Sequence, residues 1–117
     1  MQRDTDFLRA LLFKYEADDD WLLMMPGSNA PNSDEEWREA YHVKLMIDEG
    51  LLEEVGRGTM RLTSKGHDFL DAIRSDTVWN RTKGVAAEIG GSTLGILQDI
   101  ALAYLKAKAA KLLGVEV

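Results

Sequence analysis

Apolar residues recur three or four positions apart over most of the chain, and short apolar or alternating runs interrupt that spacing. A repeat of three to four residues is typical of a helix with one buried side, whereas short apolar runs between turn residues are typical of strands. The pattern therefore predicts five helices, two strands and one short apolar run that is either a third strand or an extended segment. The helices are expected over residues 4–17, 33–49, 64–74, 75–89 and 92–113, the strands over residues 51–55 and 59–63, and the apolar run over residues 21–25.

The segment from residue 33 to residue 74 organises these elements. Ser33 and Glu36 form a capping-box pair that starts its first helix, and Gly50 permits the left-handed backbone that ends this helix. A glycine-rich hairpin and a second helix follow, an order that is typical of a winged helix-turn-helix. Residues 34–49 contain no helix breaker, so the sequence leaves open whether they form one helix or two.

The expected fold is mainly α, of the α+β class: a winged helix-turn-helix with a short β-hairpin wing and two extra C-terminal helices. Residues 1–75 are expected to form the winged helix-turn-helix core. Residues 76–117 are expected to be a C-terminal helical extension of the same domain. A chain of 117 residues is long enough to bury one core without disulfide or metal help.

Charge is unevenly distributed along the chain, whose formal net charge is −6. Residues 1–74 carry 16 acids and 9 bases, a net charge of −7, whereas residues 75–117 carry 4 acids and 5 bases, a net charge of +1. Nucleic-acid-binding proteins usually present a basic footprint. Any contact with DNA would therefore depend on a local patch of cations.

Such a patch could be assembled from the central helix, the hairpin and the start of the next helix. The helix would enter a major groove, while bases near the hairpin tip would contact phosphates or a minor groove. The candidate nucleic-acid-binding residues are Arg38, His42, Lys44, Arg57, Arg61 and Lys65. The leading hypothesis is a small winged-helix regulator that associates with double-stranded DNA and is of phage or mobile-element origin. A hairpin can also carry bases simply to avoid pairing with other strands.

The central helix supports a second hypothesis. At 100° per residue, several carboxylates and one histidine share a face of this helix. These candidate partner-binding residues are Glu35, Glu39, His42 and Glu49. A negative face loses attraction for phosphate and favours a basic protein partner. The alternative function is therefore a winged-helix protein–protein interaction module that does not bind DNA.

No catalytic or metal site is expected, and no cofactor. The chain has no cysteine, and His42 and His67 are its two histidines. Neither histidine has a nucleophile or metal ligand at a recognised spacing, and no phosphate-binding loop or dinucleotide glycine motif occurs. We therefore expect a binding protein rather than an enzyme.

The last predicted helix is apolar all round its middle, from Ile100 to Leu105. Such a helix is buried on more than one side, either in its own core or against a partner. A homodimer through this helix is expected, with the dimerisation residues Leu97, Ile100, Ala101, Tyr104 and Leu105. Because the chain shows no signal-peptide pattern and no apolar run of spanning length, a cytoplasmic location without membrane contact is expected.

Several segments together resemble a known family. They are Tyr41–Leu45 with Gly50-Leu51, Arg61–Thr63, the stretch from Gly66 to Asn80, Gly90-Gly91 and Tyr104–Lys106. Over nearly its whole length the chain resembles a family of small uncharacterised winged-helix proteins of bacteria and phages, a domain of unknown function. This resemblance implies a winged-helix fold and carries over no catalytic or binding residues. Two features depart from the family pattern, namely Trp37 in place of an aliphatic residue and a short wing turn.

Overall fold

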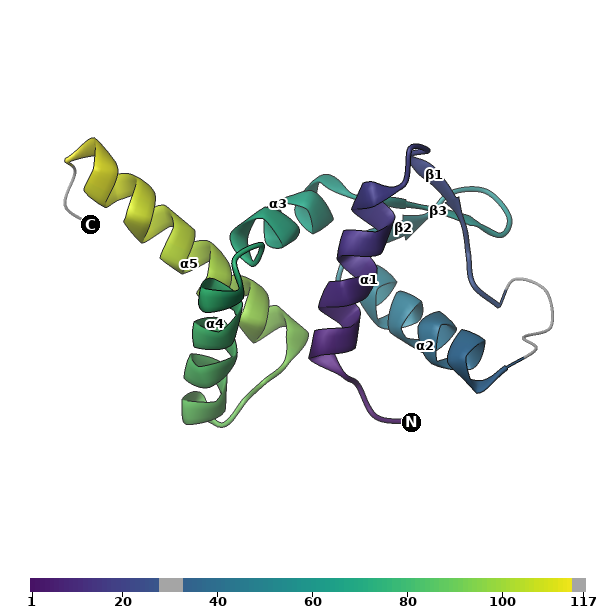
Figure 1. Cartoon of the computed structure of the whole chain (residues 1–117), viewed down its shortest axis with the longest axis horizontal. Coiled ribbons are helices and arrows are strands. Elements are labelled where there is room, and N and C mark those ends of the chain that lie inside the picture. Colours follow the sequence, from purple (N-terminus) through teal and green to yellow (C-terminus); the bar gives the residue numbers. More distant parts are fainter. Residues whose placement is uncertain (28–32, 115–117) are drawn as a thin grey trace. The chain divides into compact units, whose positions relative to one another are not determined.

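The computed structural model describes residues 1–27 and 33–114, and it contains all the helices and strands that the sequence predicts (Figure 1). The fold is mainly helical with one small antiparallel sheet, which confirms the α+β class. In chain order the elements are α1 (Thr5–Ala17), β1 (Leu22–Met24), α2 (Asp34–Asp48), β2 (Leu52–Glu54), β3 (Thr59–Leu62), α3 (Ser64–Ala72), α4 (Asp76–Ile89) and α5 (Leu94–Leu113). None of the helices in the described ranges is both long enough and apolar enough to cross a membrane.

The chain divides into two compact units, Met1–His67 and Asp68–Val117, and the division falls within α3. The first unit contains α1, α2 and the sheet. The second contains α4 and α5. The sequence predicts a boundary after residue 75 instead, at the start of α4, between two parts of one domain.

The sheet of the first unit has the strand order β1-β3-β2, and both strand pairs are antiparallel. Side chains alternate along β3, so that Met60 and Leu62 point into the core while Thr59 and Arg61 are half-exposed. Helix α1 packs on β3 and helix α2 packs on β2. The hairpin between β2 and β3 turns through two glycines with positive φ, Gly56 and Gly58.

Residues 34–48 form a single helix, which settles the question that the sequence left open. Ser33 caps this helix as predicted, because its Oγ accepts a hydrogen bond from the Glu36 N–H at 3.1 Å. Gly50 follows the last turn with φ +75°, and the Leu51 N–H donates to the Met46 carbonyl at 2.8 Å. This is the left-handed helix end that glycine permits at low cost.

Gly66 lies in the first turn of α3, where the helix packs closely against another backbone segment. A Cβ atom at this position would lie 2.2 Å from the Leu51 carbonyl oxygen and 2.8 Å from Leu62 Cδ1. No larger residue fits without moving main-chain atoms. The contact fixes the start of α3 against the segment that follows α2.

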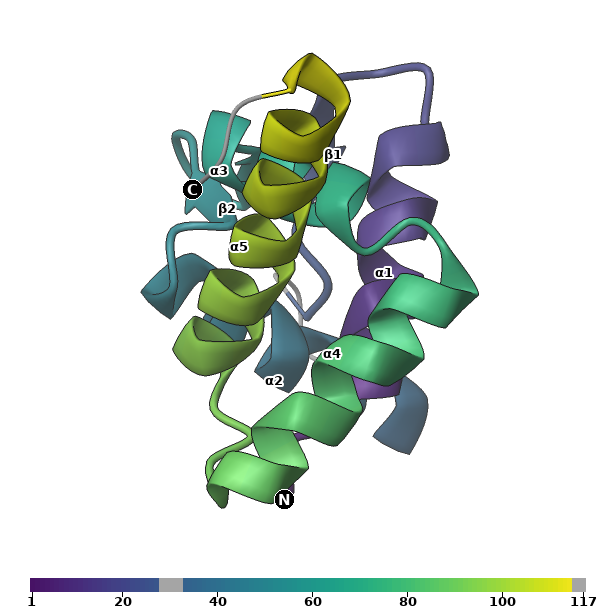
Figure 2. The same cartoon turned by 90° about the vertical axis from the view of Figure 1, so that its left-hand side faces the viewer.

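In the second unit, α4 and α5 lie side by side at the turn that connects them and run in opposite directions (Figures 1 and 2). Gly90 ends α4 with φ +85°, and Thr93 caps α5 by accepting a hydrogen bond from the Ile96 N–H at 3.1 Å. The buried residues of this pair are Trp79, Thr82, Ala86, Leu94, Leu97, Gln98 and Ala101.

Candidate binding site between helix α2 and the hairpin

The buried and exposed sides of α2 differ from those that its sequence indicated. His42, Val43 and Met46 are buried, whereas the Trp37 side chain is 55% exposed. The sequence analysis placed His42 on the polar face offered to DNA or a protein. In the structure that side faces the core, and the outward stripe runs through Trp37, Tyr41 and Lys44 at helical spacing.

His42 is fully buried, and both of its ring nitrogens are used within the first unit. Nε2 accepts a hydrogen bond from the Asp4 backbone N–H at 2.9 Å, and Nδ1 donates to the Arg38 carbonyl oxygen at 2.8 Å. The rings of Phe7 and Tyr41 meet the imidazole edge-on, with centroids 4.9 and 5.3 Å away. These contacts define a neutral imidazole with its proton on Nδ1. In this structure His42 therefore has no exposed surface to offer to DNA or to a partner.

Glu39 also faces α1 rather than a partner. Its Oε2 accepts a hydrogen bond from the Tyr15 hydroxyl at 2.7 Å and lies 3.3 Å from Lys14 Nζ. Burial raises the pKa of the Tyr15 phenol well above its usual value, and the hydrogen bond to Glu39 and the negative charge of that carboxylate raise it further. Glu39 thus forms part of the α1–α2 packing.

Two of the predicted DNA-binding arginines are engaged with neighbouring side chains. Arg38 Nη2 lies 2.6 Å from Asp4 Oδ2, and its guanidinium stacks over the Phe7 ring at 3.9 Å. Arg61 Nη2 lies 3.0 Å from an oxygen of Glu53, its direct cross-strand neighbour. Such pairs leave little net positive charge to attract phosphate.

The other three predicted cations are exposed. Lys44 lies on the outward stripe of α2, Arg57 at the hairpin tip, and Lys65 in the first turn of α3. Within the part of the chain that the structure describes, none of the three forms an ion pair. Of the six predicted nucleic-acid-binding residues, these three are therefore the ones that combine an exposed side chain with the absence of an ion pair among the described residues.

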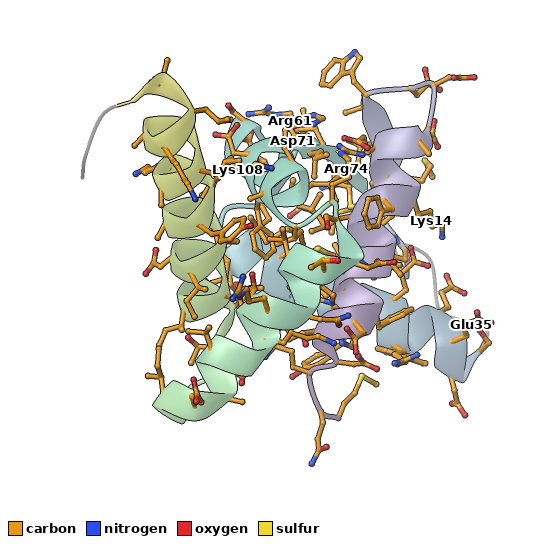
Figure 3. All side chains as sticks on the ribbon, turned by 60° about the vertical axis from the view of Figure 1, so that its left-hand side comes forward. Lys14, Glu35, Arg61, Asp71, Arg74 and Lys108 are labelled. Atoms are coloured by element: carbon orange, nitrogen blue, oxygen red, sulfur yellow. The ribbon has the colours of Figure 1, made fainter. Side chains whose placement is uncertain are left out.

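The acidic set does not form one surface. Glu35 projects into solvent from the N-terminal end of α2 (Figure 3), whereas Glu49 is half-buried at the opposite end of the helix. Glu39 and His42 lie between them and are directed inward. A partner could therefore reach only the two ends of the predicted acidic face.

A pocket of about 530 Å³ lies between α2 and the hairpin. Helix α2 contributes Trp37, Ala40, Tyr41 and Lys44, and the hairpin contributes Glu54, Arg57 and Gly58; the lining also includes Met1, Met25, Pro26 and Gly27. Its walls are mainly apolar, with two cations and one carboxylate among them. The volume falls within the range of about 300–1,000 Å³ that is usual for small-molecule sites.

The pocket was not among the predicted sites, although part of its signal is visible in the sequence. Trp37, Tyr41 and Lys44 are spaced four and three residues apart, which puts them on one stripe of a helix. In the sequence Trp37 stood out only as a departure from the family pattern, and Tyr41 only as part of the family resemblance. The contribution of the hairpin and of Met25 depends on tertiary packing and leaves no local signal.

The predicted dimerisation residues divide into two groups. Leu97 and Ala101 are buried within the chain itself and cannot meet a partner. Ile100 is half-buried, while Tyr104 and Leu105 are exposed, as are Leu112 and Leu113 in the last turns of α5. An apolar surface on α5 therefore lies in its C-terminal half.

Comparison with known proteins places the chain in a family. The family model described as "Hypothetical protein (DUF2513)" matches residues 2–92. An uncharacterised protein of Haemophilus influenzae is 33% identical over 91 residues, with 71% of this chain and 76% of that protein covered. No solved structure matches the chain. The match over most of the sequence shows that the chain belongs to the DUF2513 family, which confirms that it resembles an uncharacterised family.

Proposed function

We propose that this protein is a small winged-helix regulator that associates with double-stranded DNA, with α2 as the recognition helix and the β2–β3 hairpin as the wing. The antiparallel sheet with the strand order β1-β3-β2 and the hairpin that follows α2 support the wing of this proposal. Between β1 and the hairpin the described residues form one helix, α2, where a helix-turn-helix has two. A fold hosts many functions, so the proposal also depends on the chemistry of the exposed surface.

The observation that carries the proposal is the position of the charges around α2. The sequence suggested that three carboxylates face the groove, which would repel phosphate. In the structure Glu39 is directed toward Tyr15, and the outward stripe presents Lys44 beside two aromatic residues. Arg57 lines the same pocket as Lys44, so helix and hairpin each offer one cation on one side of the unit. Two cations placed this way suit phosphates on either side of a groove.

The proposal is tested by titrating a random-sequence DNA duplex with protein at about 50 and 200 mM salt. We expect binding in the lower salt that weakens steeply in the higher salt, because cation–phosphate contacts release counterions. The double variant Lys44→Ala/Arg57→Ala should lose at least tenfold in affinity. Its plot of log affinity against log salt should have a slope smaller by about 2, since about 0.9 is lost per phosphate contact.

The matched control is Arg81→Ala/Lys106→Ala, which removes two exposed cations from α4 and α5. This variant should bind DNA like the wild-type protein. Absence of binding at about 50 mM salt, or equal losses in the two double variants, would contradict the proposed DNA contact.

A protein–protein interaction module for a basic partner is the second candidate. It is favoured by the net charge of −6 and by the exposed carboxylate of Glu35. Binding to a lysine-rich peptide that is lost on Glu35→Gln/Glu49→Gln, in a protein that does not bind DNA, would favour this candidate over the first.

Self-association through α5 accompanies either function. The proposed contact uses the exposed residues Tyr104, Leu105, Leu112 and Leu113 rather than Leu97 and Ala101, which the chain buries itself. Exposed apolar side chains that gather on one helix commonly mark an interaction surface.

A further inference from the structure

We propose that the pocket between α2 and the hairpin binds a small amphipathic anion, namely an aromatic or aliphatic molecule that carries a single carboxylate, sulfonate or phosphate group. The regulatory part of this inference, that such a ligand competes with DNA, rests on the proposed DNA-binding function. The binding itself does not depend on that function.

The apolar side chains in the walls of the pocket predict that the ligand has an apolar body. Trp37 lines the pocket and is 55% exposed, and Tyr41, Ala40, Met25 and Pro26 extend the apolar lining. Apolar surface removed from water stabilises a complex in proportion to its area, and aromatic side chains contribute the largest share. A ligand with an apolar body therefore gains from contact with these walls.

The charges of the side chains that line the pocket predict that the ligand carries an anionic group. Lys44 and Arg57 are cations without ion pairs in the described ranges, and Glu54 is the one carboxylate that lines the pocket with them. A neutral apolar molecule would cover the walls without meeting the two cations. A bare phosphate would meet the cations and leave Trp37 exposed. An amphipathic anion matches both parts of the lining.

Hydrogen bonds hold the walls in position without a ligand. The Met25 N–H donates to the Gly58 carbonyl oxygen at 2.9 Å, which ties the segment after β1 to the hairpin. The Gly27 N–H donates to Glu36 Oε1 at 3.2 Å, which ties that segment to α2. A pocket with fixed walls binds with less ordering cost than one that must form.

The test uses two fluorescent probes that differ chiefly in one charged group. 8-Anilino-1-naphthalenesulfonate has an aromatic body and one sulfonate, and N-phenyl-1-naphthylamine has the same aromatic body without the sulfonate. We expect saturable binding of the anionic probe to the folded full-length chain, with one probe bound per chain and an affinity at least tenfold higher than for the neutral probe. Comparable binding of both probes would contradict the role of the cations.

Two sets of variants locate the site. Lys44→Gln/Arg57→Gln should weaken the anionic probe at least tenfold and leave the neutral probe unchanged, whereas Arg81→Gln/Lys106→Gln should change neither. Ala40→Phe fills the pocket and should abolish binding of both probes. If Ala40→Phe alters the circular dichroism of the protein, Trp37→Ala takes its place, with an expected loss of at least fivefold. Binding that survives the variant used would overturn the proposed site.

Competition separates this inference from the proposed function. Saturating anionic probe should release bound DNA, because both ligands use Lys44 and Arg57. A protein that binds the probe but no DNA would contradict the DNA-binding function and the competition, while the ligand site would stand. A protein that binds DNA but no probe would overturn only the ligand site.

Discussion

Helices α2 and α5 each bury one polar side chain, and the surroundings of the two side chains differ. His42 of α2 is fully buried with both ring nitrogens hydrogen-bonded. Gln98 of α5 is 3% exposed; its Nε2 donates to the Leu94 carbonyl at 3.3 Å, but its Oε1 has no partner among the described residues. A buried polar group with all its bonds made costs little, whereas an unsatisfied one costs about 1–3 kcal/mol.

The same helices also reverse what their compositions suggest. Helix α2 is rich in charged residues, yet its middle is part of the core of the first unit. Helix α5 is the more apolar of the two, yet Leu105, Leu112 and Leu113 are exposed in its C-terminal half. The comparison teaches that burial here depends on which packing partners a side chain meets rather than on the composition of its helix.

The largest expected effect comes from His42→Ala. This change opens a cavity and removes the acceptor of the Asp4 N–H, so we expect a loss of about 4 kcal/mol in the free energy of unfolding. Chemical denaturation measures it. Lys44→Ala, an exposed change on the same helix, is the control and should stay within about 0.5 kcal/mol of the wild type. Similar losses in the two variants would break the contrast between the inward and outward sides of α2.

Tyr15→Phe probes the contact that directs Glu39 inward. Removing the hydroxyl that donates to Glu39 should lower the free energy of unfolding by about 1.5 kcal/mol at pH 8, as measured by denaturation. Tyr104→Phe on exposed α5 is the control, with no change expected at that pH. Equal stability of wild type and Tyr15→Phe would mean that the hydrogen bond between Tyr15 and Glu39 does not stabilise the fold.

The difference between wild type and Tyr15→Phe should depend on pH. The pKa of Tyr15 is raised in the folded state, so above about pH 10 the unfolded chain loses the phenolic proton and the folded chain keeps it. Folding then becomes less favourable as the pH rises, by about 1.4 kcal/mol per pH unit from this group. Phenylalanine lacks the proton, so the advantage of the wild type should shrink between about pH 10 and 11. A gap that stays constant would show that Tyr15 keeps an ordinary pKa.

Gln98→Met sharpens the comparison from the side of α5. The substitution keeps the length of the side chain and removes the unsatisfied Oε1, so we expect a gain of about 1 kcal/mol in the free energy of unfolding. Thermal and chemical denaturation measure this gain. Asp99→Asn, an exposed neighbour on α5, should change stability by less than about 0.5 kcal/mol. A loss of stability in Gln98→Met would show that Oε1 does have a partner in solution.

The smallest expected effect on folding comes from Leu105→Gln/Leu112→Gln. Both side chains are exposed, so the free energy of unfolding at low concentration should change by less than about 0.5 kcal/mol. Light scattering should nevertheless show a dimeric mass for the wild type at high concentration and a monomeric mass for the variant. Ile89→Gln, an exposed apolar residue of α4, is the control and should leave the mass unchanged. A monomeric wild type would contradict self-association through α5.

Local signals in the sequence determined most of the fold. Ser33 predicted a helix start and Gly50 predicted a helix end, because each acts through its immediate neighbours. The periods of the apolar residues likewise placed the five helices and the two strands of the hairpin, β2 and β3. Such features require no knowledge of distant parts of the chain.

Only the tertiary structure decided which side of α2 is exposed and where its charges point. The partners that make this decision come from α1 and the segment before it: Asp4 meets His42 and Arg38, and Tyr15 meets Glu39, across 24 to 38 residues of sequence. The pocket arises in the same way, because Trp37 and Arg57 line one cavity only when α2 packs on β2. A helical period fixes which residues share a stripe, but the direction of that stripe depends on contacts between distant segments.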